Sequence, residues 1–243
     1  MEVIPKYASS VILIRKNSKE VEDADFEVLM IKRAETMKFL GGFHAFPGGK
    51  LKDSDYHEKN LKRCKGLDFN QAYNILNDQN TSFKERNIAL SFWVTAIREV
   101  FEEIGILIAY KNDKLIDLSI ENEKNKYQKY RQRLIEGKIS LLDVMELEDL
   151  FYAVDKLHYF RHFITPPVSP IRFDTRFFIT KLPEGQQNVD PDFKEIVDFE
   201  WLTPKMTLKK YRKKEIKIIP PQYACLKGLM NKNFITENRN NLF

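Results

Sequence analysis

The segment Arg98–Ile106 (Arg-Glu-Val-Phe-Glu-Glu-Ile-Gly-Ile) concentrates side chains that could do chemistry. On an α-helix, at about 100° per residue, the carboxylates of Glu99, Glu102 and Glu103 fall within an arc of about 100°. Carboxylates this close repel one another unless a cation lies among them. Hard divalent cations such as Mg²⁺ or Mn²⁺ prefer oxygen ligands. The pattern is therefore suited to a metal site on one face of a helix, although by itself it is more often a solvated acidic surface.

Two further features bear on this interpretation. Arg98 lies one turn before Glu102 and can hold that side chain through a charge-assisted hydrogen bond. Alternatively, the two residues form an ordinary ion pair on a solvated helix face. An upstream turn at Gly48 and Gly49, with Asp55 shortly after it, favours the chemical interpretation. Adjacent glycines let the backbone turn sharply and offer a carbonyl to a ligand.

Together these segments resemble the Nudix hydrolase signature, G-x5-E-x7-R-E-U-x-E-E-x-G-U, where U is aliphatic. Gly49 matches the first glycine, and Arg98–Ile106 matches the second half at every fixed position. Asp55 stands where the signature has its first Glu, and 42 residues (56 to 97) replace the seven that precede Arg98 in the signature. This insertion resembles the branch of the family that includes the peroxisomal coenzyme A diphosphatase.

Other segments carry the same resemblance: His44–Gly49, Ala96–Glu99, Thr165–Pro167 and Arg172–Phe178. The resemblance implies an α+β fold, a Nudix-like α/β/α sandwich with a mixed sheet, a central catalytic helix and added helices. It also implies metal-dependent cleavage of a diphosphate linkage, with coenzyme A or an acyl derivative as the first candidate substrate. Nucleotide sugars, dinucleotides and nucleoside triphosphates are the runner-up. A non-catalytic Nudix-like nucleotide- or RNA-binding module is the alternative from another class.

The catalytic group expected on the helix contains Arg98 and the three glutamates. Glu102 and Glu103 are assigned as the principal ligands of Mg²⁺ or Mn²⁺. Glu99 is a ligand or the general base, because a metal-bound carboxylate and a base differ only in their position relative to water. Asp55 is one methylene shorter than the expected Glu, so its role stays open.

Additional ligands are expected outside the helix. The resemblance implies that the backbone carbonyl of Gly48 or Gly49 adds a neutral metal ligand. Glu195 precedes Trp201 by six positions, and some Nudix hydrolases supply a ligand or base from a similar spacing. A surface acid next to Lys194 is the alternative. Three nearby acids compete with it: Asp190, Asp192 and Asp198.

Two arginines flank an acid in a predicted strand. Arg172, Asp174 and Arg176 share one face if the strand has period two. One interpretation is phosphate recognition by the arginines, with Asp174 fixing them as substrate-binding groups. The other is a structural ladder of ion pairs.

The surrounding sequence predicts the elements that must position these groups. Apolar runs bounded by turn residues predict strands at 8–16, 26–33, 43–46, 106–110, 158–165, 172–182 and 196–202. Helical periodicity predicts helices at about 83–104, 121–136, 141–150, after Pro204 and at about 222–230, and weakly at 69–76. The longest helix buries an apolar stripe opposite its carboxylates and ends at Gly105.

Length and composition indicate one Nudix-like domain over residues 1–243. An insertion at about 56–84 is expected as an irregular surface excursion without chemistry, with a substrate-contacting lid or a dimer contact as the alternative. A helical segment covers about 203–243. The net charge of +5 suits a phosphate-bearing small molecule, and a nucleic-acid partner is not expected. The oligomeric state stays open.

Four features of the chain lead us to expect a protein of the cytoplasm. No apolar run is long enough to cross a bilayer. Met1–Tyr7 lacks a signal-peptide pattern, and Asn241–Phe243 is not a peroxisomal tripeptide. Two cysteines, Cys64 and Cys225, do not suggest a disulfide scaffold.

Overall fold

The computed structural model describes residues 3–17, 24–77, 85–192 and 194–230. The strands are β1 (Lys6–Lys16), β2 (Phe26–Arg33), β3 (His44–Ala45), β4 (Gly48–Lys50), β5 (Cys64–Lys65), β6 (Ala109–Lys111), β7 (Lys114–Leu115), β8 (Phe151–Ala153), β9 (His158–Ile164), β10 (Phe173–Lys181) and β11 (Ile196–Leu202). The helices are α1 (Glu58–Lys62), α2 (Phe69–Asn77), α3 (Ser91–Ile104), α4 (Glu121–Ile135), α5 (Leu141–Leu147), α6 (Pro204–Arg212) and α7 (Pro220–Met230). Short 3-10 turns are η1 (Asp53–Tyr56), η2 (Arg86–Ile88) and η3 (Val154–Lys156).

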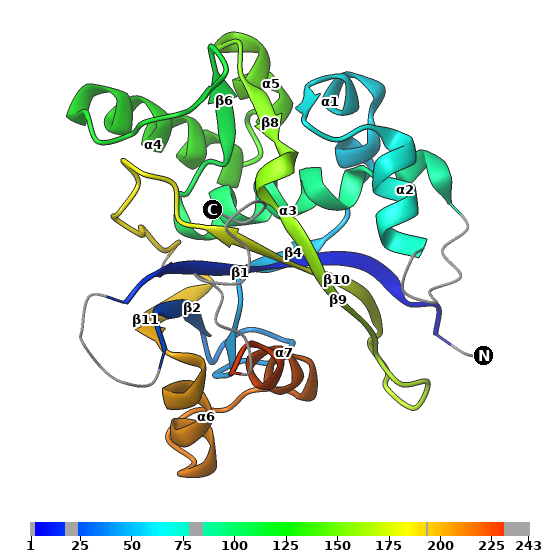
Figure 1. Ribbon diagram of the computed structural model, residues 1–243, viewed down its shortest axis with the longest axis vertical. Coiled ribbons are helices and arrows are strands. Elements are labelled where there is room, and N and C mark those ends of the chain that lie inside the picture. Colours follow the sequence, from blue (N-terminus) through cyan, green and yellow to red (C-terminus); the bar gives the residue numbers. More distant parts are fainter. Residues whose placement is uncertain (1–2, 18–23, 78–84, 193, 231–243) are drawn as a thin grey trace.

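The main sheet is mixed and is covered on both faces. Its order is β11-β2-β1-β10-β9, with β3 beside β2 and β4 beside β1. β1 runs parallel to β10 and antiparallel to β2. Val11 and Leu13 join the apolar core that contains α3, whereas Ile12 and Ile14 join the core that contains α7. Figure 1 shows α1 to α5 on one side of this sheet and α6 and α7 on the other. This is the predicted α/β/α arrangement.

The helix that carries the carboxylates starts later than expected. Residues 83 and 84 lie outside the described residues, and the chain passes through η2 before α3 begins at Ser91. The Ser91 hydroxyl donates to the Ile88 carbonyl at 2.5 Å, a local bond that competes with the helical ladder. The helix ends as predicted, at Gly105 with φ of 75°. Since Arg98, Glu99 and Glu103 are all buried, the charged face does not lie in bulk solvent.

The strand expected at 106–110 is only partly formed. The strand β6 begins only at Ala109. Before Ala109, a side chain takes the place of a neighbouring strand as the hydrogen-bond partner of the backbone. The Gln186 amide accepts from the Leu107 N–H at 2.8 Å and donates to the Leu107 carbonyl at 2.9 Å. The backbone groups of Leu107 are therefore satisfied without a second strand.

The prediction that residues 56–84 form an irregular surface excursion is wrong for the first part of this segment. Residues 58–65 form α1 and β5, and β5 pairs with β8 in a second sheet of order β5-β8-β6-β7. Buried Asn60 accepts from the Tyr152 hydroxyl at 2.6 Å and donates to the Ser54 carbonyl at 2.7 Å. These bonds tie the segment to the body of the protein. Residues 78–84 lie outside the described residues.

The C-terminal helices begin at the prolines that predict them, Pro204 and Pro220. The Thr203 hydroxyl caps α6 by accepting from the Met206 N–H at 3.1 Å. α7 buries Cys225, Leu226 and Leu229 against the sheet. The predicted helical segment continues to 243, but 231–243 lie outside the described residues. Within the described ranges, no helix has the length and apolar character that crossing a membrane requires.

Candidate active site

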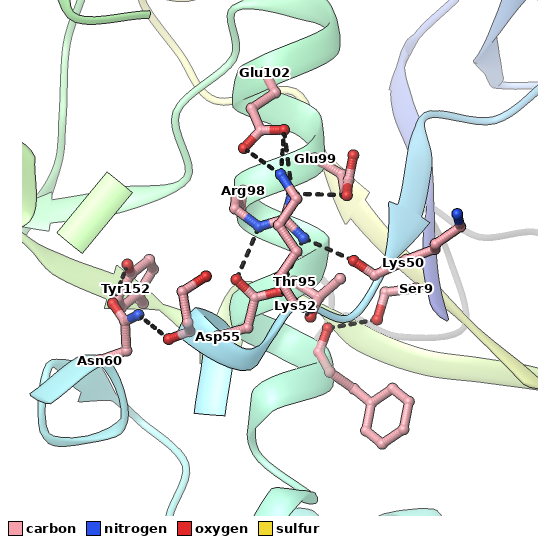
Figure 2. Close-up of polar contacts among 12 residues, drawn as sticks. Ser9, Lys50, Lys52, Asp55, Asn60, Thr95, Arg98, Glu99, Glu102 and Tyr152 are labelled. Carbon is pink, nitrogen blue, oxygen red and sulfur yellow. Dashed lines mark hydrogen bonds and ion pairs between the residues drawn. The ribbon is translucent and has the colours of Figure 1, made fainter. Parts of the chain in front are cut away.

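Arg98 is the centre of the polar network on α3 (Figure 2). Its Nε and Nη2 donate to the two oxygens of Asp55, each at 2.8 Å. Its Nη1 donates to Glu99 at 2.7 Å and to Glu102 at 3.2 Å, and Nη2 also donates to the Lys50 carbonyl at 2.8 Å. A guanidinium has five N–H donors, so these bonds use all of them. Arg98 therefore positions the carboxylates, as expected for Glu102.

Asp55 faces Arg98 and not the carboxylate cluster. The turn η1 places it in the interior with 1% exposure. Besides Arg98, its Oδ2 accepts from the Thr95 hydroxyl at 2.9 Å and from the Lys52 N–H at 3.0 Å. Both oxygens are occupied within the protein. The turn η1 therefore brings this shorter side chain within hydrogen-bond distance of Arg98.

The glycine turn touches two of the glutamates directly. The Gly48 N–H donates to Glu103 Oε2 at 2.9 Å. A Cβ atom on Gly49 would lie only 2.5 Å from Glu99 Oε1, so no larger residue fits there while Glu99 keeps its position. β4 is held beside β1 by the pairing of Ser9 with Gly49. The glycine turn and the helix therefore meet at Glu99 and Glu103.

Burial raises the pKa of two of these carboxyls. The pKa of Glu99 is raised by desolvation and by the charge of Glu102, although Arg98 opposes the shift. The pKa of Glu103 is raised well above its ordinary value, first by desolvation and then by Glu99. The Gly48 N–H and the Arg33 guanidinium partly oppose this second shift. Buried like charges of this kind favour a bound cation.

The donor set fits a hard divalent cation by its chemistry. Glu102 is less buried than its neighbours and also pairs with Lys52 Nζ at 3.2 Å. Among the described residues, no three His, Cys, Asp or Glu side chains are grouped so that they could hold an ion. In this arrangement Arg98, Lys52 and the Gly48 N–H each donate a hydrogen bond to a carboxylate oxygen that could otherwise bind an ion. Three neighbouring carboxylates, two with raised pKa, are nevertheless ligands suited to Mg²⁺ or Mn²⁺.

Comparison with known proteins places this geometry in a family. A family model described as the NUDT19 Nudix domain matches residues 5–229. The chain belongs to this Nudix family. The crystal structure of a NUDIX hydrolase from Alicyclobacillus acidocaldarius is 27% identical, with a TM-score of 0.75, and the match covers 95% of this chain and 93% of that one. The predicted family and fold are confirmed.

Two curated relatives are named acyl-coenzyme A diphosphatase NUDT19. The protein from Xenopus laevis is 26% identical over 230 residues, which make up 85% of this chain and 60% of that protein. The human protein is 26% identical over 232 residues, 85% of this chain and 61% of that protein. The chain therefore spans about three fifths of the length of these relatives.

Glu195 lies beside the C-terminal end of this Nudix helix. Its carbonyl accepts from the Ala34 N–H at 2.8 Å, and its side chain is exposed. Its charge raises the pKa of Glu103, so the acid selected by the Glu-to-Trp spacing is close to the cluster. Of its competitors, Asp190 pairs with Arg131 and Asp198 acts on the pKa of His44. A metal-binding role for Glu195 stays a prediction.

Arg172 and Arg176 make buried contacts of their own. Arg176 is 2% exposed, pairs with Asp174 and lies over the Phe92 ring with 4.4 Å between its Cζ and the ring centroid. His162 Nε2 contacts the same Asp174 carboxylate at 2.5 Å. Arg172 donates to the carbonyls of Thr165 at 2.9 Å and Val3 at 2.7 Å. These buried contacts favour the structural interpretation over phosphate recognition.

Arg131 is a site residue that the sequence did not reveal. It lies on α4, and its Nε and Nη2 donate to the Glu102 carbonyl at 3.1 and 3.0 Å. Its Nη1 donates to Asp190 at 3.0 Å, and the Asp190 N–H donates to the Ile104 carbonyl at 3.0 Å. Arg131 thereby satisfies a free carbonyl at the end of the Nudix helix. A single arginine on a polar helix carries no sequence signal of such a contact.

Gly49→Ala is expected to weaken metal-dependent activity about a hundredfold. The added methyl group displaces the Glu99 carboxylate, and a shift of about 1 Å at a reacting group can cost that much. Metal titration followed by calorimetry and turnover measurements test this. Gly137→Ala controls for a general loss of stability, because nothing lies within 4 Å of its Cβ position but its φ of 70° strains an alanine there. Equal activity losses in the two variants would contradict the assigned contact.

Proposed function

We propose that the chain is a metal-dependent Nudix hydrolase that cleaves a diphosphate linkage in coenzyme A or an acyl derivative. The observation that carries the proposal is the saturated Arg98 network, which holds Asp55, Glu99 and Glu102 beside the glycine turn. A binding module would have no need for buried carboxylates held at raised pKa.

Each residue has a separate task in the proposed reaction. Glu102 and Glu103 are the principal metal ligands, and the carbonyl at Gly48 or Gly49 adds a neutral one. A bound Mg²⁺ or Mn²⁺ supplies charge neutralisation and lowers the pKa of bound water. Glu99 is a ligand or accepts the proton from the attacking water, for which its raised pKa is suitable.

Support for coenzyme A as the substrate comes from the two relatives named acyl-coenzyme A diphosphatase. The matched region covers 85% of this chain in each case and includes the glycine turn and the Nudix helix. Nucleotide sugars, dinucleotides and nucleoside triphosphates share the same phosphoanhydride chemistry. We also propose a reducing compartment such as the cytoplasm, with Cys64 and Cys225 as free thiols.

A substrate panel tests the proposal. Purified protein is incubated with coenzyme A, acetyl-coenzyme A, a nucleotide sugar, a dinucleotide and a nucleoside triphosphate in Mg²⁺ or Mn²⁺. We expect coenzyme A to release 4′-phosphopantetheine and adenosine 3′,5′-bisphosphate, and we expect EDTA to stop the release. Faster cleavage of another class would reassign the substrate. Binding without cleavage of any compound would support the non-catalytic alternative.

A further inference from the structure

Arg33 is a cation that acts on Glu103 but whose guanidinium makes no hydrogen bond or ion pair with the described residues. It ends β2, and its side chain makes no hydrogen bond or ion pair within the described part of the chain. Its Nε is buried and lacks a hydrogen-bond acceptor. Buried polar groups in folded proteins nearly always have partners, so an unpaired guanidinium nitrogen calls for an explanation.

The backbone of Arg33 is held firmly on both sides. Its N–H donates to the Phe43 carbonyl at 3.0 Å, and its carbonyl accepts from the Gly42 N–H at 3.1 Å. On the opposite edge, Ile196 of β11 pairs with Arg33. The side chain therefore projects from a fixed platform, as precise binding of a ligand requires.

The register of β2 sends the side chain toward the Nudix helix. Leu29 and Ile31 pack into the core that contains α3, whereas Val28 and Met30 pack into the other core. With period two, Arg33 shares the face of Leu29 and Ile31. The electrostatic effect of Arg33 on Glu103 agrees with this direction.

Two other cations beside the glutamates, Arg98 and Lys52, are already engaged. All five donors of Arg98 are used, and Lys52 pairs with Glu102. A diphosphate brought to three glutamates is repelled by them and requires positive charge close by. A guanidinium suits phosphate oxygens because its planar donors match them in pairs.

We propose that the Arg33 guanidinium binds a non-bridging oxygen of the substrate diphosphate on the Glu103 side of the cluster. The assignment rests on the proposed hydrolase function and makes Arg33 a substrate contact that the sequence signature does not contain. It takes the place of the phosphate-binding role first considered for Arg172 and Arg176, whose side chains are buried and bonded elsewhere.

Binding of imidodiphosphate, a diphosphate that resists hydrolysis, tests the assignment without depending on the identity of the natural substrate. Affinity is measured by calorimetry at saturating Mg²⁺ for wild type, Arg33→Gln and Lys32→Gln. Lys32 is the matched control, because it carries the same charge on the adjacent residue of β2 but acts on His44, its pairing partner on β3. We expect Arg33→Gln to bind at least about tenfold more weakly, the loss typical of one charge-assisted hydrogen bond. Lys32→Gln is expected to match wild type.

Two results would overturn the assignment. The first is unchanged imidodiphosphate affinity in Arg33→Gln, which would make Arg33 only a counter-ion of Glu103. The second is an equal loss in Lys32→Gln, which would reduce the effect to general surface charge. If Arg33→Gln unfolds, Arg33→Met keeps the buried stem, and the same tenfold loss is required of it. Because wild-type turnover is scored separately on the substrate panel, a failure of the proposed function is distinguishable from a failure of this assignment.

Discussion

Glu103→Gln is expected to lower turnover at least about a hundredfold, as when a principal stabiliser of transition-state charge is removed. Glutamine keeps the size of the side chain, and its amide oxygen can still accept from the Gly48 N–H. It loses the charge that holds a cation next to the diphosphate. Turnover on the best substrate of the panel, at saturating Mg²⁺ or Mn²⁺, measures the effect. Intact turnover would refute the assignment of Glu103 as a metal ligand.

The same variant is expected to be more stable than wild type when metal is removed at alkaline pH. The pKa of Glu103 is raised in the folded protein, so the folded state binds a proton more tightly than the unfolded state does. Its contribution is fully present below the ordinary pKa of 4.5 and is lost as pH rises through the folded-state pKa. Glutamine does not titrate and escapes this loss.

Thermal unfolding in EDTA at pH 4 and at pH 8 separates the two states of Glu103. Glu103→Gln should match wild type at the lower pH and exceed it at the higher one. Glu146→Gln, at an exposed position of α5, controls for the loss of one charge. A gain of equal size in both variants would show that the buried position of Glu103 is not the cause.

Asp55→Asn is expected to lower the free energy of unfolding by about 3 kcal/mol, the scale measured when a buried ion pair loses one partner. The asparagine amide turns a donor toward donors of Arg98, which is itself buried. A displaced Arg98 no longer fixes Glu99 and Glu102, so turnover should also fall by about a hundredfold. Urea unfolding and turnover below the unfolding transition measure the two effects.

Asp53→Asn is the matched control for this variant. Asp53 lies in the same turn, η1, and its side chain is exposed. The control removes an equal charge without touching Arg98, so both its stability and its turnover should stay close to wild type. A stable Asp55→Asn protein with full turnover would mean that Arg98 does not depend on Asp55.

Local patterns were sufficient for most of the elements. The strands at 26–33 and 196–202 have the predicted bounds, because apolar runs between turn residues report on strand formation directly. The start of α3 and the first half of the strand expected at 106–110 were predicted less well. In both places a side chain, from Ser91 or Gln186, satisfies backbone groups that the periodicity assigns to regular structure.

The sequence by itself determined the chemistry of the helix face, since the spacing of Glu99, Glu102 and Glu103 follows from helical geometry alone. Only the tertiary structure decided which cations and glycines meet these carboxylates. Asp55 reaches Arg98 across 43 positions, and β2 places Arg33 on the sheet face that packs against α3, where it acts on Glu103. Such contacts depend on strand register and on how the chain crosses the sheet, and no local rule encodes either of them.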